Sequence, residues 1–265
     1  MPNNSFASTI DSWKHLADID YFGMYVKAYI PFNAWMNLNY KDLDSDRAKI
    51  NAIKRDDNVF RKKIVSLLQF DDQDSIAFRT SLGALHVALE RASIVNQGNT
   101  LTFSGIWFKS KNKPVKDTSR YGVVYHAHYG SPGKPTETVL TLKRKSKGAQ
   151  DKCFVFQDYE YDLKLVGAKL QEIVNQSWRD ELLNCYRGVA PLEKVTLLAK
   201  PEARKYILCG EFKFIDDVEM LSQGIIEIFY NLRNALFHGE VNPKGDAQKV
   251  YGAAYHLLRP VIEVL

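Results

Sequence analysis

Cysteine is scarce in this chain, and its spacing argues against two common uses of the residue. The 265 residues include three cysteines, Cys153, Cys185 and Cys209, an odd number with no close pair. A disulfide framework needs paired cysteines, and most cysteine metal motifs place two of them a few residues apart. We therefore expect neither a disulfide nor a cysteine metal site, and a reducing, cytoplasmic location fits.

Long hydrophobic runs and nucleotide-binding loops are missing as well. No apolar stretch approaches the roughly 18 residues of a membrane-spanning helix. The first residues do not combine a basic segment with an apolar core, as secretory signals do. The glycine-rich fingerprints of phosphate and dinucleotide binding are also absent. We expect no membrane contact, no secretion and no cofactor.

Charge of one sign does not dominate the chain. With 36 Lys and Arg against 31 Asp and Glu, the formal net charge is +5, and 45% of the residues are hydrophobic. Such a chain buries a full core. A mildly basic surface is compatible with a polyanionic partner such as RNA, but it lacks the charge density of a nucleic-acid coat protein.

What the chain contains is a helical pattern interrupted by a β-rich segment. Residues 1–98 and 161–265 carry helical periodicity, whereas 99–160 holds short β-rich runs separated by glycine, proline and lysine. The pattern predicts an α+β fold, mainly α, with a small antiparallel β-sheet inserted between two helical parts that form one domain. The expected strands are Leu101 to Lys109, Tyr121 to Tyr129, Thr136 to Lys145 and Cys153 to Tyr159.

Three helical segments are expected in the first part. An aromatic helix covers residues 18–41, and Pro31 should kink or split it. Residues 45–69 form one helix or two that join near residues 55–58, and Ser75 is expected to cap the next helix.

The most informative stretch is an amphipathic helix predicted between Asp216 and Gly239. Asp216 and Glu219 resemble a capping box, and Gly239 marks the helix end. Two adjacent apolar rows suggest that the helix is buried on two sides, by its own domain and by another subunit or domain. A polar row would then line the cleft between them, and we assign Glu227, Tyr230 and Asn231 to that cleft.

The last turn of this helix carries groups suited to phosphoryl chemistry. His238 lies at the negative end of the helix dipole, which favours its imidazolium form and suits a general acid or base. Arg233 can bind a phosphate bidentately, and Asn234 can orient either group. These groups suffice to cleave RNA without a metal, by attack of the ribose 2′-hydroxyl to leave a 2′,3′-cyclic phosphate.

The segment Tyr230 to Gly239, Tyr-Asn-Leu-Arg-Asn-Ala-Leu-Phe-His-Gly, resembles the signature of the HEPN superfamily. Its members are helical bundles that commonly dimerise, and many are metal-independent ribonucleases of toxin, antiviral-defence and RNA-processing systems. The resemblance covers about a tenth of the chain. It implies that Arg233 and His238 are catalytic, with Asn234 in support, in a composite site of a homodimer that works beside an antitoxin or a defence partner.

Other residues match the loose spacing of that signature. Arg79 to His86 and Arg120 to His126 do so, but the first pair lies within a helix among apolar residues and the second in an expected strand. Arg233 is set apart by the polar residue after it and by the helix end at His238. The alternative interpretation is that His238 caps the helix and Arg233 pairs with a carboxylate.

The β-rich segment carries basic clusters and two histidines on one strand face. The clusters contain Lys111, Lys113, Lys143, Arg144 and Lys145, which either track an RNA backbone or solubilise the hairpin ends. His126 and His128 lack a third ligand nearby, so no metal site is expected. The alternative function is a non-catalytic dimerisation or RNA-binding adaptor that acts with a partner protein.

Overall fold

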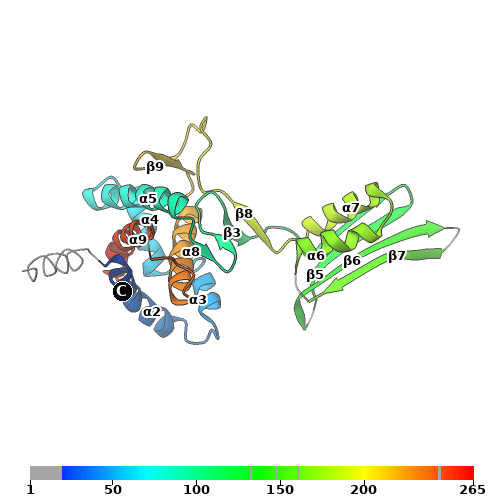
Figure 1. Ribbon diagram of the computed structural model, residues 1–265, viewed down its shortest axis with the longest axis horizontal. Helices are drawn as coiled ribbons and strands as arrows, with labels where there is room; N and C mark the ends of the chain where they lie inside the picture. Colours follow the sequence, from blue (N-terminus) through cyan, green and yellow to red (C-terminus); the bar gives the residue numbers. More distant parts are fainter. Residues whose placement is uncertain (1–19, 132, 147–148, 160, 244–245) are drawn as a thin grey trace, which may run out of the picture. The chain divides into compact units, whose positions relative to one another are not determined.

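A computed structural model describes residues 20–131, 133–146, 149–159, 161–243 and 246–265, without the side chains of 145–153. It has two compact units (Figure 1). The helical unit combines Met1–Ile106 with Val195–Leu265, and the sheet unit is Trp107–Lys194. The predicted α+β class, with more helix than strand and an inserted antiparallel sheet, is confirmed. None of the helices in the described ranges is long and apolar enough to cross a membrane.

The helical unit is a bundle built around α8, Val218–Phe237. Figure 1 shows α8 with α3, α4 and α9 around it, and all three contact it. Short hairpins complete the unit. The other elements are α2 (Tyr21–Asn39), α3 (Asp46–Ile53), α4 (Val59–Gln69), α5 (Gln73–Ala92), α9 (Ala247–Ile262), β1 (Val95–Asn96) with β2 (Asn99–Thr100), and β9 (Ile207–Cys209) with β10 (Phe212–Phe214).

Two buried tyrosines fix α8 in the bundle. The Tyr25 hydroxyl donates to the carbonyl of Phe229 at 2.7 Å, and the Tyr251 hydroxyl donates to the carbonyl of Leu232 at 2.8 Å. Burial raises the pKa of both phenols above the ordinary value, so both remain donors at neutral pH. The aromatic residues of α2 therefore belong largely to the core of this unit.

Helix starts and stops differ from the expected ones by one to three residues. The cap of α5 is Asp72, which accepts from the Ser75 amide at 2.9 Å, and the cap of α8 is Asp217, which accepts from the Met220 amide at 2.9 Å. Residues 54–58 separate α3 from α4, so the region 45–69 forms two helices, one of the two expected arrangements. Pro31 does not split α2, because it lies on the exposed side, where water can satisfy the carbonyl that loses its amide partner.

The sheet unit is a four-stranded antiparallel meander in the order β4-β5-β6-β7. Its apolar face, with Tyr125, Ala127 and Leu142, packs against Leu182 and Tyr186 in one core. Figure 1 shows the helices on one side of the sheet. The elements are β4 (Val115–Arg120), β5 (Val123–Ser131), β6 (Lys134–Ser146), β7 (Ala149–Asp158), α6 (Leu163–Lys169), a 3-10 turn (Leu170–Glu172) and α7 (Gln176–Arg187).

Two features of this unit differ from the sequence-based expectation. The stretch expected as a first strand, Leu101 to Lys109, contributes only β3 (Ile106–Lys109), which pairs with β8 (Leu192–Val195) where the chain enters and leaves the unit. The edge strand β4 takes the first place in the meander instead. It is largely exposed and lacks the apolar alternation that marks a strand in sequence.

The second difference is the boundary of the insertion. The sequence pattern predicts an insertion at 99–160 and assigns everything from residue 161 onward to the C-terminal helical part, whereas the compact unit runs from Trp107 to Lys194. The reason is packing: Val166, Leu182 and Tyr186 bury their apolar surface against the sheet. Residues 1–106 and 195–265 form one unit.

Candidate functional site

The C-terminal end of α8 has a regular helix stop. The amide of Gly239 donates to Leu236 at 3.2 Å and that of Glu240 donates to Ala235 at 2.9 Å, which together form a Schellman motif. Gly239 has φ +70°, the left-handed conformation that glycine adopts without strain. This turn leaves His238 as the C-cap residue directly after Phe237, at the negative end of the helix dipole.

His238 and Arg233 have different surroundings. His238 is exposed, and within the described ranges its ring has no side-chain hydrogen bond or ion pair. Arg233 is partly buried and points toward α3. Its Nη1 lies 3.0 Å from Oδ1 of Asn234 and 3.7 Å from a carboxylate oxygen of Asp46, and its guanidinium lies over the Phe237 ring at 5.0 Å.

Within one chain the two groups are not assembled into a pair. Five residues separate them, which is about 140° around a helix, and no contact between them occurs among the described residues. Asn234 is buried; its side chain accepts from Arg233, and its backbone carbonyl accepts from the His238 amide at 2.9 Å. A site that uses both groups therefore needs a histidine or an arginine from elsewhere.

Glu227 is the centre of a second, buried polar cluster. Its carboxylate accepts from Arg47 at 2.7 and 2.9 Å, from Lys54 at 2.7 Å and from Nδ2 of Asn231 at 3.0 Å. Asn231 in turn accepts from Asn96 at 2.8 Å. Burial acts to raise the pKa of Glu227, but the charges of Lys54 and Arg47 outweigh it, and the pKa lies below its ordinary value.

This cluster contradicts the expectation that the polar row of α8 lines a cleft. Glu227 and Tyr230 are buried inside the helical unit and do not line a cleft with a second subunit. The ring of Tyr230 is covered by the guanidinium of Arg47, 4.4 Å from its centroid. Both apolar rows of α8 are therefore covered mainly by its own unit, and the exception is Phe237, whose side chain is 61% exposed.

Sequence reasoning missed Arg47, Lys54 and Asp46. Asp46 and Arg47 lie on α3 and Lys54 directly follows it, and Arg47 is 180 residues from its partner Glu227. The sequence offered one signal: Arg47 and Lys54 are seven residues apart, so they share a helix face. A buried acidic residue on α8 needs such cations, but the chain order does not say which helix supplies them.

The other pairs that match the signature's spacing have structural roles. Arg79 donates to the backbone carbonyl of Phe70 beyond the end of α4 and pairs with Asp71 at 2.7 Å. His86 is buried, and its ring packs edge-on against Phe212 at a centroid distance of 4.8 Å. Its pKa is lowered by burial, so its neutral form is favoured.

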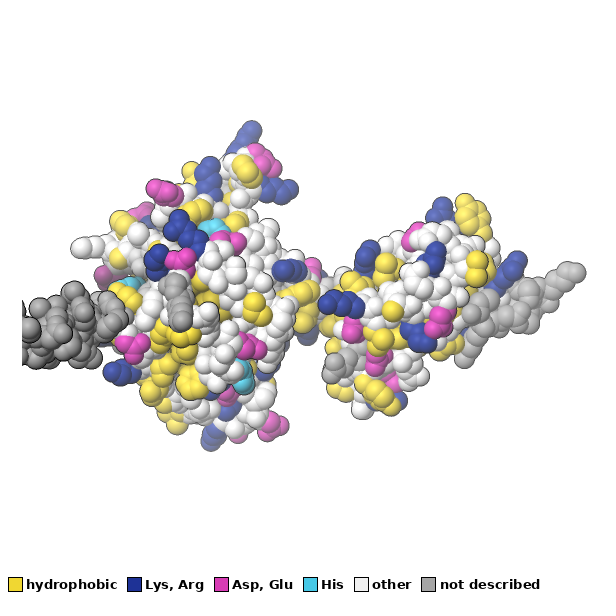
Figure 2. Space-filling view, in the orientation of Figure 1, with side chains coloured by type: hydrophobic (Ala, Val, Ile, Leu, Met, Phe, Trp, Pro, Cys, Tyr) yellow, Lys and Arg dark blue, Asp and Glu magenta, His cyan; other side chains and the backbone are white. Residues whose placement is uncertain are grey.

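The basic residues of the sheet unit do not form one patch. Lys111 and Lys113 precede β4, at the end of the sheet where Pro114 accepts from the Tyr129 amide, whereas Lys143 pairs with Val124 at the other end. At about 3.3 Å per residue, the two clusters lie roughly 20 Å apart along the strands. Arg144 adjoins Lys143 and is exposed, and the Lys145 side chain lies outside the described part. On the visible face in Figure 2, basic side chains of this unit alternate with uncharged and acidic ones.

The two histidines of β5 do not have the contacts of a pair of metal ligands. His126 Nδ1 lies 2.6 Å from Oδ1 of Asp117 on β4, and the ring of His128 is 6.4 Å from that of His126. No group of three His, Cys, Asp or Glu side chains suited to a metal ion occurs among the described residues. Cys185 and Cys209 are free and buried thiols.

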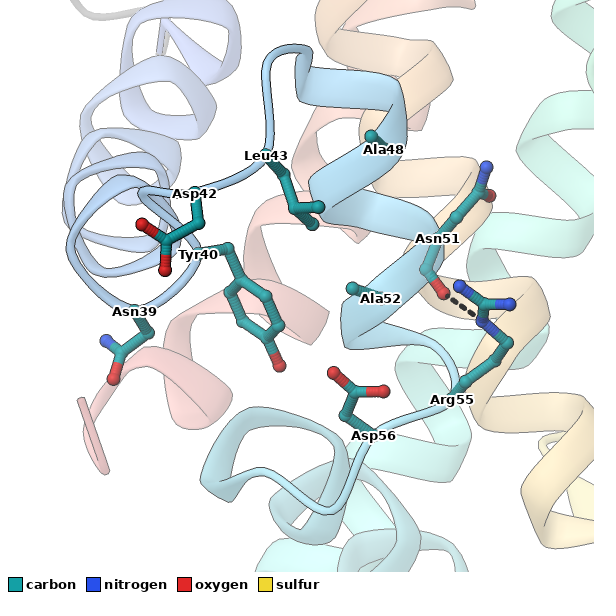
Figure 3. A pocket seen from close by; sticks show the side chains of 9 residues that line it. All are labelled: Asn39, Tyr40, Asp42, Leu43, Ala48, Asn51, Ala52, Arg55 and Asp56. Atoms are coloured by element: carbon teal, nitrogen blue, oxygen red, sulfur yellow. Dashed lines mark hydrogen bonds between the residues drawn. The ribbon is translucent and has the colours of Figure 1, made fainter. Parts of the chain in front are cut away.

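Two hollows lie among the described residues. One of about 550 Å³ lies between the end of α2 and α3, where Tyr40 and Asp56 point toward each other (Figure 3). Its charged lining residues are Asp42, Asp56 and Arg55, an acidic balance that does not suit RNA. The other, of about 570 Å³ in the sheet unit, is mainly apolar, and its acidic group, Glu172, is paired with Lys169.

Comparison of the chain with models of known protein families, with curated proteins and with solved structures found no match. The function is therefore inferred from the residues and their geometry.

Proposed function

We propose that this protein is a metal-independent endoribonuclease that acts as a homodimer with a HEPN-type site. Arg233 and His238 are its catalytic residues, and Asn234 positions the arginine. The resemblance at Tyr230 to Gly239 supports a role in a toxin or antiviral-defence system, with an antitoxin or defence protein as partner.

The observation that carries the proposal is an exposed imidazole at the end of α8, one turn after a guanidinium that is held in place. Asn234 and Asp46 contact Arg233 through Nη1 alone, so Nε and Nη2 have no hydrogen bond among the described residues. Free guanidinium N–H groups bind phosphate oxygens, and an accessible histidine moves protons near neutral pH.

The reaction follows from these two groups. A neutral His238 accepts the proton of the ribose 2′-hydroxyl while the 2′-oxygen attacks the adjacent phosphorus. The bond from phosphorus to the 5′-oxygen breaks, and that oxygen takes up a proton from water. Arg233 neutralises the added charge of the pentavalent phosphorus in the transition state. The products are a 2′,3′-cyclic phosphate and a 5′-hydroxyl.

A second copy is part of the proposal because one chain holds its arginine and histidine about 140° apart around α8. Phe237 lies between them in the sequence and exposes 61% of its side chain. Aromatic side chains are enriched in the core of protein–protein interfaces, so we place the contact between the two copies at Phe237. Pairing two α8 ends around this ring would bring each histidine near the arginine of the other copy.

The test is cleavage of total cellular RNA in EDTA. His238→Ala and Arg233→Ala should each lower the cleavage rate at least about a hundredfold, as loss of a general base or of charge stabilisation does. His256→Ala and Arg55→Ala are matched controls, because both side chains are exposed in the same unit and neither contacts Arg233 or Asn234. Cleavage that requires an added divalent metal would contradict the mechanism.

The alternative, a non-catalytic RNA-binding adaptor, is favoured by one feature of the sheet unit. Its helices pack on one face of the sheet, and on the opposite face Val155 of β7 is 52% exposed. Charge reversal at Lys143 and Arg144 should then abolish RNA binding, whereas His238→Ala should have no effect.

A further inference from the structure

We propose that Arg47 and Arg233 together form a preassembled binding site for one phosphodiester group of RNA, with Glu227 as the residue that positions Arg47. The inference rests on the proposed function for its ligand. It adds to that function a residue from α3 and a reason for the buried ion cluster beneath α8.

Arg47 is held from two sides while much of it stays in water. Its Nη1 donates to both carboxylate oxygens of Glu227, and its guanidinium covers the Tyr230 ring at 4.4 Å. The side chain is nevertheless 45% exposed. A guanidinium fixed in this way loses little conformational entropy when it binds a ligand.

Glu227 does not need Arg47 for its own neutralisation. Lys54 approaches the carboxylate at 2.7 Å with only 12% of its side chain exposed, and Asn231 adds a hydrogen bond at 3.0 Å. One buried cation and an amide already compensate one buried carboxylate. The second, more exposed cation is therefore in excess.

The net charge of the cluster also favours binding of an anion. Arg47, Lys54 and Arg233 carry three positive charges, and Glu227 and Asp46 carry two negative ones, which leaves a surplus of one. The contact between Arg233 and Asp46 is long, at 3.7 Å. A phosphodiester has one negative charge and matches that surplus.

The two guanidinium groups lie against neighbouring residues of α8. Tyr230, which Arg47 covers, and Arg233 are three residues apart and so are neighbours on one helix face. Each guanidinium is anchored through Nη1, and within the described part of the chain Nε and Nη2 of both have no hydrogen-bond partner. Two such groups offer the paired N–H geometry that phosphate oxygens accept.

The buried hydroxyl of Tyr29 lies in the electric field of the same cluster. Burial raises its pKa, and the charges of Arg233 and Arg47 oppose that shift while Asp46 adds to it. The phenol therefore keeps its proton and adds no negative charge to the site.

The experiment measures binding of a fluorescent single-stranded RNA to His238→Ala protein in EDTA, by anisotropy over a range of salt concentrations. Arg47→Ala in that background should weaken binding about tenfold or more. It should also reduce the slope of log affinity against log salt by about 0.7, the value for one lost phosphate contact on a single strand. Arg47→Lys keeps the charge and should retain that slope while losing part of the affinity.

Arg55→Ala is the matched control. Arg55 follows the same helix, carries the same charge and donates through Nε to the backbone carbonyl of Asn51 instead of to α8. Its loss should change neither affinity nor slope. Thermal unfolding checks that each variant is folded. If Arg47→Ala does not fold, the Arg47→Lys variant is used for the binding test in its place.

The outcomes separate this inference from the proposed function. Unchanged affinity and slope in folded Arg47→Ala, or no RNA binding by the parent protein, would overturn the inference. RNA binding that depends on Arg47 in a protein that never cleaves RNA would support it and refute the nuclease. Cleavage that depends on Arg233 and His238 but not on Arg47 would support the nuclease and overturn the inference.

Discussion

At the scale of residues, one carboxylate decides how much of α8 is available for chemistry. The sequence predicts Glu227, in the polar row of the helix, as a cleft residue, yet it is buried and paired with Arg47 of α3 and with Lys54. The row therefore divides into an internal part at Glu227 and Asn231 and an external part at His238. The proposed chemistry belongs to the external part at His238. The internal part at Glu227 and Asn231 holds the nearby cations in place.

Glu227→Gln should destabilise the helical unit by about 3 kcal/mol at neutral pH, because Lys54 and Arg47 lose the charge that compensates them. Since the pKa of Glu227 is below its ordinary value in the folded protein, its contribution is fully present above about pH 4.5. That contribution is lost as pH falls below this value. Chemical unfolding at several pH values measures both effects.

The control for this substitution is Glu219→Gln on the same helix. Glu219 is half exposed and pairs with Arg61 at the surface, so its loss should cost less than about 1 kcal/mol. Equal stability of the two variants at pH 7 would show that Glu227 is not the central charge of the cluster.

At the scale of elements, periodicity predicted what is local and missed what is distant. The limits of α8 and the gap between α3 and α4 follow from apolar spacing and capping residues, which act over a few positions. The ion partners of Glu227 are 173 and 180 residues away, and no local rule identifies them. An amphipathic pattern also shows that α7 has an apolar face but not which body covers it, and so the boundary was placed before α7.

Gly83 gives an element-scale prediction for the contact between α5 and the β9–β10 hairpin. A Cβ at this position would lie 2.3 Å from the backbone carbonyl oxygen of Cys209, an atom that does not move without the hairpin. Gly83→Ala should therefore destabilise the helical unit by about 1–3 kcal/mol despite its better helix propensity.

Gly167→Ala on α6 is the contrasting substitution, because nothing lies within 4 Å of its added Cβ. It should be neutral or stabilising by up to about 1 kcal/mol. Thermal unfolding of both variants makes the comparison, and a stabilised Gly83→Ala would rule out the close packing of helix and hairpin.

At the scale of the whole molecule, the proposal depends on a second copy at the end of α8. The fold class and the inserted antiparallel sheet could be predicted from composition and pattern, because both depend on periodicity summed over many residues. Contacts between two copies of the chain produce no periodic pattern in the sequence, so the dimer could not be predicted in this way. In the structure, the exposed Phe237 is what points to it.

Phe237→Asp should shift the protein from dimer to monomer in light scattering or analytical ultracentrifugation, since a charge would enter an apolar contact. RNA cleavage should fall with dimer content. Val174→Asp, at an almost fully exposed apolar position of the sheet unit, should leave the mass unchanged. A Phe237→Asp protein that remains dimeric and active would place the interface elsewhere.

The most direct test of the central claim mixes two inactive proteins. Arg233→Ala and His238→Ala, each silent toward RNA in EDTA, should regain part of the wild-type cleavage when combined, because the heterodimer contains one complete pair of groups. The new ends should be 2′,3′-cyclic phosphates. No cleavage by the wild-type protein, or cleavage by His238→Ala alone, would contradict the account.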